Sequence, residues 1–428
     1  MQYEHVVCAF CGCLCDDIDV TVEEGRIIQA KNTCILGKAW FLDHGKPQDL
    51  PVARINGQAA GLDEGIDAAA KLLADAHYPM LYGLSSTSCE AQRQAIALAE
   101  ILGGCIDCCT SVCHGPSGMA VQGVGEPTCS LGEVKNRADL LIYWGSNPAE
   151  SHPRHMARYA VTPKGMFIPN GRKDRTVVLV DVRRSPSSRA ADIVITLKPG
   201  KDYEVLWALR ALILGHKIEE ASLASTGITM DQLYDLAERM KKCKFGVLFV
   251  GQGLTQSRGK FMNTTAAFLL VRDMNKTNKF ALIPMRGHGN VTGIDNVMAW
   301  QTGYPFGVNF SKGYPRFNPG EFTMVDVLSR GEADAVLTIA SDPVASLPAT
   351  VRRRLNEIPV IAIDTHESET TRIAQVAFTA ATAGIGVEGT AYRMDNVPLH
   401  LSNVLPSPFP SDEELLSRLL TRVKELNS

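Results

Sequence analysis

Four cysteines near the start of the chain have the spacing of metal ligands. Cys8, Cys11 and Cys15 form a run of three, and Cys34 follows after a gap, shortly before Lys38. Four thiolates in such an order can hold a [4Fe–4S] cluster. Zinc is the alternative, although structural zinc sites more often combine two close pairs of ligands or include histidines. The spacing therefore favours an iron–sulfur cluster bound by these four cysteines.

A different kind of site is indicated by Cys113 and His114, which are followed by Gly115 and Pro116. A single thiolate offers one soft ligand to a heavier metal. A chain with an electron-transfer cluster and a separate one-thiolate site is predicted to be a redox enzyme. Cys13 has no assigned role, and either packing or a place next to the cluster ligands is expected for it. Packing on a buried strand is the expectation for Cys105, Cys108 and Cys109.

Three loops in series carry residues suited to a nucleotide. Gly145 directly follows the segment 138–144 and opens an expected helix, where backbone N–H groups can point at a phosphate. Asp181 ends the next apolar run, a position from which a carboxylate can bind a ribose hydroxyl. Asp202, two residues after Gly200, can accept from the N1–H and N2–H edge of guanine. Each loop alone is typical of an ordinary βα turn, but the series predicts a nucleotide-bearing cofactor.

Two further glycine-containing loops carry weaker signals. Gly251 and Gly253 resemble a phosphate turn but lack the third glycine of a dinucleotide fingerprint. Arg286 is followed by a glycine, and its planar guanidinium suits a carboxylate. A salt-bridged surface loop is the alternative for Arg286. The chain has no Walker A sequence, so ATP hydrolysis is not expected.

Composition narrows the class of protein. The chain has 428 residues and a formal net charge of −3, so neither nucleic acid nor an acidic membrane surface is an expected partner. Residues 1–20 lack the pattern of a signal peptide, and no apolar stretch is long enough to span a bilayer. A cytoplasmic location is therefore expected, in which the 12 cysteines stay reduced.

The elements that must position these residues alternate between short apolar strands and helices from about residue 63 onward. Continuous apolar strands between helices are typical of parallel sheets built from βαβ units. Residues 17–30 alternate as two strands joined at Glu24 and Gly25, and Ser411 begins a C-terminal helix with a capping box. The expected buried strands lie at 79–84, 138–144, 176–182, 245–250, 280–284, 335–339 and 359–364.

The predicted fold class is α/β, with a small β-rich iron–sulfur domain and two interwoven α/β domains whose sheets are mostly parallel. One sheet does not conveniently hold so many strands, which is why two such domains are expected. The expected iron–sulfur domain is 1–50, completed by 385–428. The α/β domain that carries Cys113 is expected at 51–137 and 285–384, and the nucleotide-binding domain at 138–284.

Taken in order, these motifs resemble those of the molybdopterin oxidoreductases, the superfamily of dimethylsulfoxide reductase and formate dehydrogenase. The set spans almost the whole chain and is specific, although each motif alone is weak. Within that superfamily, the Cys113-His114 site, the Arg286–Asn290 loop and the short length are similar to the B subunits of formylmethanofuran dehydrogenases. The matching segments of the superfamily are the cysteine run with Gly37-Lys38, Trp144–Pro148, Asp181–Ser185, Pro199–Asp202 and Glu388–Arg393.

The resemblance implies a bis(molybdopterin guanine dinucleotide) cofactor with tungsten or molybdenum, and Cys113 as the protein ligand of that metal. It also implies that His114 and Arg286 line the active site, with Arg286 positioning a carboxylate or CO2 oxygen. Lys38 would lie between cluster and pterin. The other implied cofactor-binding residues are Gly145, Asn147, Asp181, Arg183, Gly200, Asp202, Gly251, Gly253, His288, Asn290, Gly389 and Arg393.

The resemblance further implies that CO2 is reduced to formate, which an amidohydrolase subunit then condenses with methanofuran in the first step of CO2-based methanogenesis. The C-terminal β-barrel domain of the superfamily is not expected in this chain, so a separate barrel-domain subunit would complete the pterin site. The implied electron-transfer partners are polyferredoxin-type subunits and heterodisulfide reductase.

Three alternatives stay open. The first is a formate dehydrogenase catalytic subunit, which would differ in its partners rather than in this site. The second is a metal-free scaffold subunit of a formyltransferase/hydrolase complex, against which the intact cysteines argue. The third is a zinc-stapled nucleotide-binding module, which leaves Cys113 and His114 unexplained. The sequence does not separate tungsten from molybdenum.

Overall fold

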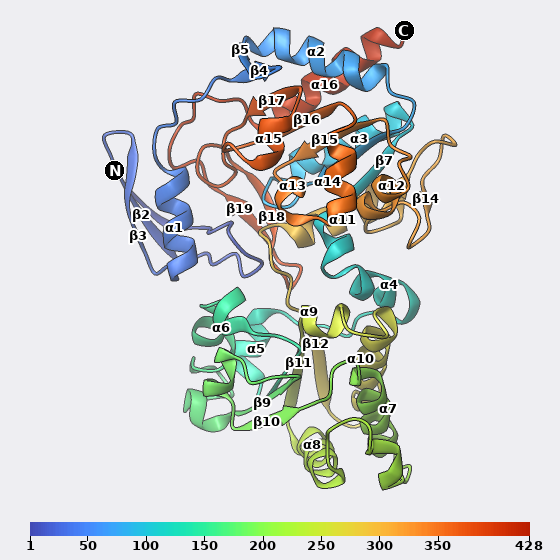
Figure 1. The fold of residues 1–428 in the computed structure, drawn as a ribbon. Coiled ribbons are helices and arrows are strands. Elements are labelled where there is room, and N and C mark those ends of the chain that lie inside the picture. The colour runs from blue at the N-terminus through green and yellow to red at the C-terminus, as the bar shows by residue number, and fades with distance from the viewer. The chain divides into compact units, whose positions relative to one another are not determined.

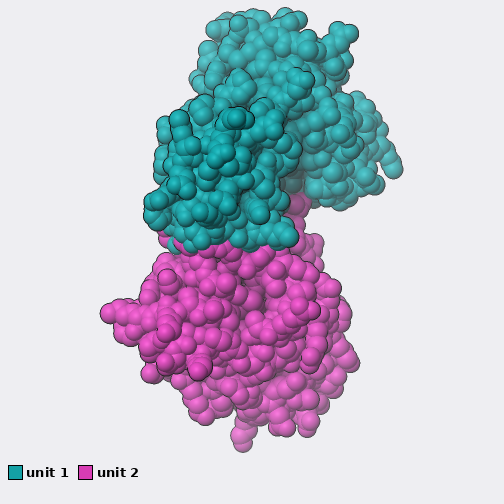
Figure 2. All heavy atoms as spheres, turned by 90° about the vertical axis from the view of Figure 1, so that its left-hand side faces the viewer, with its two compact units in different colours: residues 1–111, 288–393, 398–428 teal, residues 112–287, 394–397 magenta.

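Two large β-sheets organise the chain, and each lies within its own unit of the structure. The computed structural model describes residues 1–428. Unit 1 contains residues 1–111, 288–393 and 398–428, and unit 2 contains residues 112–287 and 394–397 (Figure 2). Helices combined with largely parallel sheets confirm the predicted α/β class. The finer division into three domains stays a prediction.

The sheet of unit 2 has five parallel strands in the order β10-β9-β8-β11-β12. Figure 1 labels β9, β10, β11 and β12 of this sheet. One face packs on α4, α7, α8 and α10 through alternate strand residues, and most residues of the other face are buried as well. Burial on both faces explains the continuous apolar runs in the sequence. The winding reverses between β8 and β11, so their carboxyl ends form a topological switch point. The strands are β8 (Leu140–Trp144), β9 (Thr176–Asp181), β10 (Ile193–Thr196), β11 (Phe245–Val250) and β12 (Lys279–Pro284).

The sheet of unit 1 has nine strands in the order β14-β13-β7-β6-β15-β16-β17-β4-β5. The central five, from β7 to β17, are parallel, and antiparallel strands close both edges. Here the winding reverses between β6 and β15, which gives unit 1 a switch point of its own. The strands are β4 (Ala53–Ile55), β5 (Gln58–Ala60), β6 (Pro79–Gly83), β7 (Cys105–Cys108), β13 (Val308–Asn309), β14 (Arg316–Phe317), β15 (Ala335–Ile339), β16 (Val360–Asp364) and β17 (Val376–Thr379).

A small antiparallel sheet in unit 1 holds the loop that carries the first cysteines. It consists of β1 (Gln2–Val6), β2 (Ile18–Glu23) and β3 (Arg26–Lys31). The predicted strand pair is confirmed, and its turn residues Glu24 and Gly25 have φ values of 46° and 71°. A separate hairpin joins β18 (Gly389–Tyr392) to β19 (Pro398–Leu401).

Helices complete both units. The predicted C-terminal helix is confirmed as α16, where the Ser411 hydroxyl accepts from the Glu414 amide at 3.0 Å. None of the helices combines the length and the apolar character that a membrane span requires. The helices of unit 1 are α1 (Ile35–His44), α2 (Leu62–Ala74), α3 (Cys89–Leu102), α11 (Val291–Thr302), α12 (Met324–Ser329), α13 (Pro343–Ser346), α14 (Ala349–Leu355), α15 (Glu369–Ile373) and α16 (Asp412–Leu426). Those of unit 2 are α4 (Gly115–Val124), α5 (Leu131–Arg137), α6 (Pro148–Ser151), α7 (Asp202–Ile213), α8 (Met230–Lys242), α9 (Gln252–Thr255) and α10 (Phe261–Met274). Short 3-10 turns lie at Cys109–Val112, Gly171–Asp174, Pro186–Ala190 and Glu220–Leu223, and a π turn lies at Met156–Ala160.

Candidate functional site

The loop between β1 and β2 carries three of the four predicted cluster ligands. Cys8, Cys11 and Cys15 are buried there, and the Cys8 amide donates to the Cys15 carbonyl at 2.9 Å, which folds the loop back on itself. Cys34 caps the N-terminus of α1, where its Sγ accepts from the Gly37 amide at 3.3 Å. A loop and a helix cap thus present the four thiols.

The four thiols lie close enough to influence one another's ionisation. Burial raises the pKa of Cys8 well above its usual value, and Cys11, Cys15 and Cys34 raise it further. A Cβ built on Gly37 would lie 3.0 Å from the Cys8 sulfur and 3.7 Å from the Cys34 sulfur, so the glycine leaves the space beside both free. No group of three or more His, Cys, Asp or Glu side chains is arranged to hold a single metal ion. Four neighbouring thiols, with a glycine in place of a side chain beside two of them, form a donor set that fits an iron–sulfur cluster.

Two other predicted residues adjoin this group. Cys13 is buried, and its thiol donates to Cys11, which lowers the pKa of Cys11. Lys38 lies one turn after Cys34 on α1 and is exposed. Its place on an electron path stays a prediction.

His288 and Gly289 pack directly on the cysteine loop. Cys11 and His288 form an isolated antiparallel bridge, and the Gly289 amide donates to the Phe10 carbonyl at 3.2 Å. A Cβ on Gly289 would lie 1.7 Å from the Ala9 carbonyl oxygen. Contact with the backbone of the cysteine loop therefore requires glycine at this position.

The switch point of unit 1 carries a concentration of left-handed backbone. Gly83, Leu84 and Ser86 after β6 have φ values of 117°, 67° and 59°, and Ala340 after β15 has 48°. Such conformations cost free energy in residues other than glycine, and they cluster at ligand sites. The segment 84–88 is not among the residues predicted from the sequence. Its signal is a glycine at the end of an apolar run, followed by hydroxyl side chains.

Two predicted cofactor residues contact this segment. The side-chain nitrogen of Asn290 donates to the Thr87 carbonyl at 2.6 Å. A Cβ on Gly389 would lie 2.7 Å from the Cβ of Ser88. The structure therefore brings Asn290 and Gly389, which are far apart in the sequence, to the switch point of unit 1. Arg393, which follows β18, is buried.

Three predicted glycines interlock at the switch point of unit 2. The Gly253 amide donates to the Gly145 carbonyl at 2.9 Å, and a Cβ on Gly251 would lie 2.2 Å from that oxygen. A Cβ on Gly145, whose φ is 56°, would lie 2.5 Å from the Leu254 nitrogen. The loops after β8 and β11 approach each other so closely that only glycine fits. This contact accounts for the glycines that the sequence suggests as phosphate turns.

Polar residues at the same edge are held by hydrogen bonds. Asp202 begins α7, and its two oxygens accept from the Trp144 indole at 2.9 Å and the Ser257 hydroxyl at 2.8 Å. Burial raises the pKa of Asp202, and these two donors oppose the increase. The Asn147 side-chain oxygen accepts from the Ser187 hydroxyl at 2.7 Å. Recognition of guanine by Asp202 stays a prediction, and each carboxylate oxygen has a further lone pair for it.

The loops after β9 and β10 add charge to this edge. Asp181 ends β9 and accepts from the Val182 amide at 2.7 Å. Arg183 and Lys198 follow β9 and β10 without an ion pair. Gly200 packs on Arg258, since a Cβ there would lie 3.1 Å from the Arg258 Cβ. Positive side chains at the carboxyl edge of a parallel sheet suit an anionic ligand.

The one-thiolate site also lies at this edge of unit 2, together with Arg286. The Cys113 carbonyl accepts from the Thr255 hydroxyl at 2.9 Å, which ties Cys113 to the loop after β11. His114 Nε2 lies 3.1 Å from the carbonyl oxygen of Met285, the residue that follows β12. Cys113 is half-buried, and His114 and Arg286 are buried. The structure thus brings the three predicted catalytic residues together.

Burial shifts the pKa values of titratable groups near Arg286. Burial lowers the pKa of His114 to about 3, and Arg286 contributes to this decrease, so His114 is neutral at pH 7. Burial raises the pKa of Glu126, and Arg286 opposes the increase. His152 Nε2 lies 2.8 Å from the Arg286 carbonyl oxygen. Glu126 and His152 are absent from the sequence prediction, because a single Glu or His in a loop carries no spacing that identifies it.

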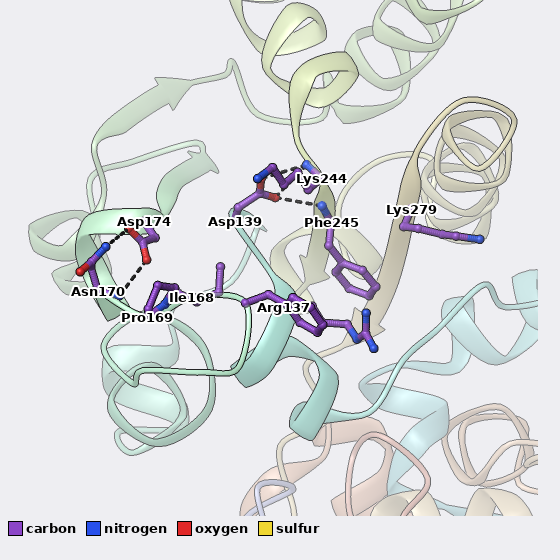
Figure 3. Close-up of a pocket in the computed structure, with 10 residues that line it drawn as sticks. Arg137, Asp139, Ile168, Pro169, Asn170, Asp174, Lys244, Phe245 and Lys279 are labelled. Atoms are coloured by element: carbon purple, nitrogen blue, oxygen red, sulfur yellow. Dashed lines mark hydrogen bonds between the residues drawn. The ribbon is translucent and has the colours of Figure 1, made fainter.

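A separate cavity of about 510 Å³ lies at the opposite, amino edge of the unit 2 sheet (Figure 3). Asp139 lies in its wall and accepts from the amides of Lys244 and Phe245 at 2.9 Å. Arg137 also lines the cavity, with its guanidinium over the Phe167 ring. Because ligands of open parallel sheets bind at the carboxyl edge, this cavity is not part of the candidate site.

The fold places the chain among known proteins. Its structure is similar to a chain of the formyltransferase/hydrolase complex of Methylorubrum extorquens, solved with methylofuran, with a TM-score of 0.71 and 25% identity over 88% of this chain and 99% of that one. It is also similar in fold to acetylene hydratase of Pelobacter acetylenicus, with a TM-score of 0.74 and 12% identity over 99% of this chain and 69% of that one. The fold is therefore that of the molybdopterin oxidoreductases.

Sequence similarity identifies the family within this class. No protein-family model matches the chain. The chain is 45% identical to the B subunit of the tungsten-containing formylmethanofuran dehydrogenase 2 of Methanocaldococcus jannaschii, over 99% of this chain and 98% of that protein. The chain belongs to the family of formylmethanofuran dehydrogenase B subunits, whose members are parts of an oxidoreductase complex.

Proposed function

We propose that this chain is the catalytic subunit that interconverts CO2 and formate at a tungsten or molybdenum ion bound by Cys113. The observation that carries the proposal is the arrangement in unit 2 of Cys113, His114 and Arg286. One half-buried thiol and one buried guanidinium lie at the carboxyl edge of a parallel sheet, where ligands of such sheets bind. The relative from Methanocaldococcus jannaschii is named as a subunit of a tungsten-containing enzyme, which supports the proposed metal.

A bis(molybdopterin guanine dinucleotide) cofactor is supported by the presence of two switch points. Each unit has its own, between β8 and β11 in unit 2 and between β6 and β15 in unit 1. Open parallel sheets bind nucleotides at such points, so each sheet offers a place for one dinucleotide arm. Arg183 and Lys198 in unit 2 supply positive charge for a pyrophosphate. In unit 1 the segment 84–88 offers hydroxyl groups and backbone amides.

A [4Fe–4S] cluster bound by Cys8, Cys11, Cys15 and Cys34 would supply electrons. The four neighbouring thiols support this assignment. Reduction of CO2 to formate consumes two electrons and one proton, and the metal with its pterins supplies the redox chemistry when bound.

The residues of this chain supply binding, orientation and exclusion of water. The guanidinium of Arg286 binds a carboxylate oxygen and stabilises the negative charge that develops as CO2 becomes formate. His114 stays neutral and adds no second positive charge. Glu126, whose pKa is raised by burial, is the nearby group able to hold a proton.

The partners we propose are the remaining subunits of the complex. These are an amidohydrolase subunit that joins formate to methanofuran, a barrel-domain subunit that completes the pterin site, and polyferredoxin-type electron-transfer subunits. The similarity to the B subunit of a multisubunit dehydrogenase and to a chain of a formyltransferase/hydrolase complex supports this set.

The test compares Cys113→Ala with Cys129→Ala in the anaerobically purified complex. Cys129 is a buried cysteine of the same unit, so it controls for the loss of a thiol. We expect Cys113→Ala to lose tungsten or molybdenum and at least about 100-fold in CO2 reduction, whereas Cys129→Ala keeps both. Full metal content and turnover in Cys113→Ala would refute the proposal.

A further inference from the structure

The loop that carries Arg286 is held at its backbone by a histidine that the proposed function does not use. His152 directly follows α6, and its Nε2 lies 2.8 Å from the Arg286 carbonyl oxygen. A carbonyl only accepts hydrogen bonds, so Nε2 carries the proton and donates it. The contact joins the segment after β8 to the loop after β12.

The second ring nitrogen of His152 has a partner that suits this tautomer. The Ser151 hydroxyl lies 2.8 Å from Nδ1, nearer than the 3.1 Å that separates it from the Asn147 carbonyl oxygen. Burial lowers the pKa of His152 to about 4, so the ring is neutral at pH 7 and Nδ1 accepts from Ser151. His152 therefore presents one donor to the loop without adding a charge beside Arg286.

We propose that His152 is a positioning residue that fixes the orientation of Arg286 toward the one-carbon carboxylate. Other bonds hold neighbouring residues of the loop: the Met285 amide donates to the Val250 carbonyl at 2.8 Å, His114 donates to the Met285 carbonyl at 3.1 Å, and the Gly289 amide donates to the Phe10 carbonyl at 3.2 Å. His152 thus supplies the bond on the carbonyl of Arg286 itself. This inference rests on the proposed role of Arg286.

The chain offers a matched control in His155. This histidine lies three residues further along in the same unit and is equally buried, but neither of its ring nitrogens has a hydrogen-bond partner. Its ring packs edge-on against Phe249, with 4.8 Å between the ring centroids. Replacement of His155 by Phe removes a buried imidazole without removing a bond to the Arg286 loop.

The experiment uses the full complex with His152→Phe, His152→Gln, His152→Asn or His155→Phe. The side-chain amide nitrogen of Gln can reach the position of Nε2, whereas the Asn side chain is too short to do so. Formate oxidation with a viologen acceptor gives KM and kcat, and hydrogen exchange of the peptide that spans residues 285–289 reports on the loop. Thermal unfolding and iron content identify variants that fail to fold.

We expect His152→Phe and His152→Asn to raise KM for formate about tenfold with a smaller change in kcat, because binding of the carboxylate is weakened. Hydrogen exchange of the 285–289 peptide should become faster in both. His152→Gln should restore both quantities toward those of the wild type, and His155→Phe should leave them unchanged.

Equal exchange rates and equal KM values in His152→Phe and His155→Phe would overturn the inference, as would failure of His152→Gln to improve on His152→Asn. Hydrogen exchange separates this result from failure of the proposed function. If the wild-type complex did not turn over formate, the proposed function would fail, and the effect of His152 on the loop would still be decided by the exchange rates.

Discussion

Substitution of Gly289 by alanine should disturb the cysteine loop of unit 1, an effect that no pattern in the sequence predicts. The new Cβ would lie 1.7 Å from the Ala9 carbonyl oxygen, a backbone atom that no side-chain rotation can move away. A carbon normally approaches a carbonyl oxygen no closer than about 3.3 Å, so the two segments must separate by about 1.6 Å. Overpacking of this kind costs about 1–3 kcal/mol. The displaced segment is the one that carries Cys8 and Cys11.

Thermal unfolding and the iron content of the purified complex measure this effect. We expect Gly289→Ala to lower both the unfolding temperature and the iron content. Gly287→Ala is the matched control, because a Cβ on Gly287 meets no atom within 4 Å and its φ is not in the left-handed region. Wild-type stability and iron content in Gly289→Ala would refute the reasoning from the close contact.

Three further predictions follow from the same units. Gly37→Ala should lower the iron content, since its Cβ would lie 3.0 Å from the Cys8 sulfur, although alanine favours a helix by about 1 kcal/mol; an unchanged iron content would contradict this. Cys13→Ala should keep its iron while Cys15→Ala loses it, and the reverse result, read by iron analysis and electron paramagnetic resonance, would exchange their roles. Burial raises the pKa of Asp412 from 3.8 to about 7, so the stability that folding gains from this group is full below pH 4 and is lost as the pH rises to 7. Asp412→Asn should therefore be more stable than the wild type at pH 8, by about 1.4 kcal/mol for each pKa unit of the shift, and denaturant unfolding with the same pH dependence in both proteins would argue against it.

Much of the fold could be predicted from the sequence where hydrophobic patterning alone decides it. The expected apolar runs form strands, for example 245–250 as β11 and 335–339 as β15, because both faces of the parallel sheets are buried. Strand β7 is not among the expected apolar runs because its sequence is Cys-Ile-Asp-Cys, although the expected packing of Cys105 and Cys108 on a buried strand is confirmed. The buried Asp107 in this strand accepts from the amides of Gly307 and Met324, more than 190 residues further along.

The candidate site was predictable where spacing carries chemistry and not where tertiary contacts do. The cysteine run and the Cys113-His114 pair have recognisable patterns. Glycine is required at positions 145 and 253 because two loops approach each other closely there. These loops are neighbours only because of the order of the strands in the sheet. His152 and the segment 84–88 likewise could not be predicted, because their contacts are with residues far away in the sequence.

The most direct test of the central claim is elemental analysis of the native complex, purified without oxygen and counted per copy of this chain. The account predicts about one tungsten or molybdenum ion per chain together with abundant iron, because Cys113 offers one soft ligand and the four clustered cysteines hold iron. Iron or zinc without either heavier metal, in a preparation shown to retain its cofactors, would contradict it.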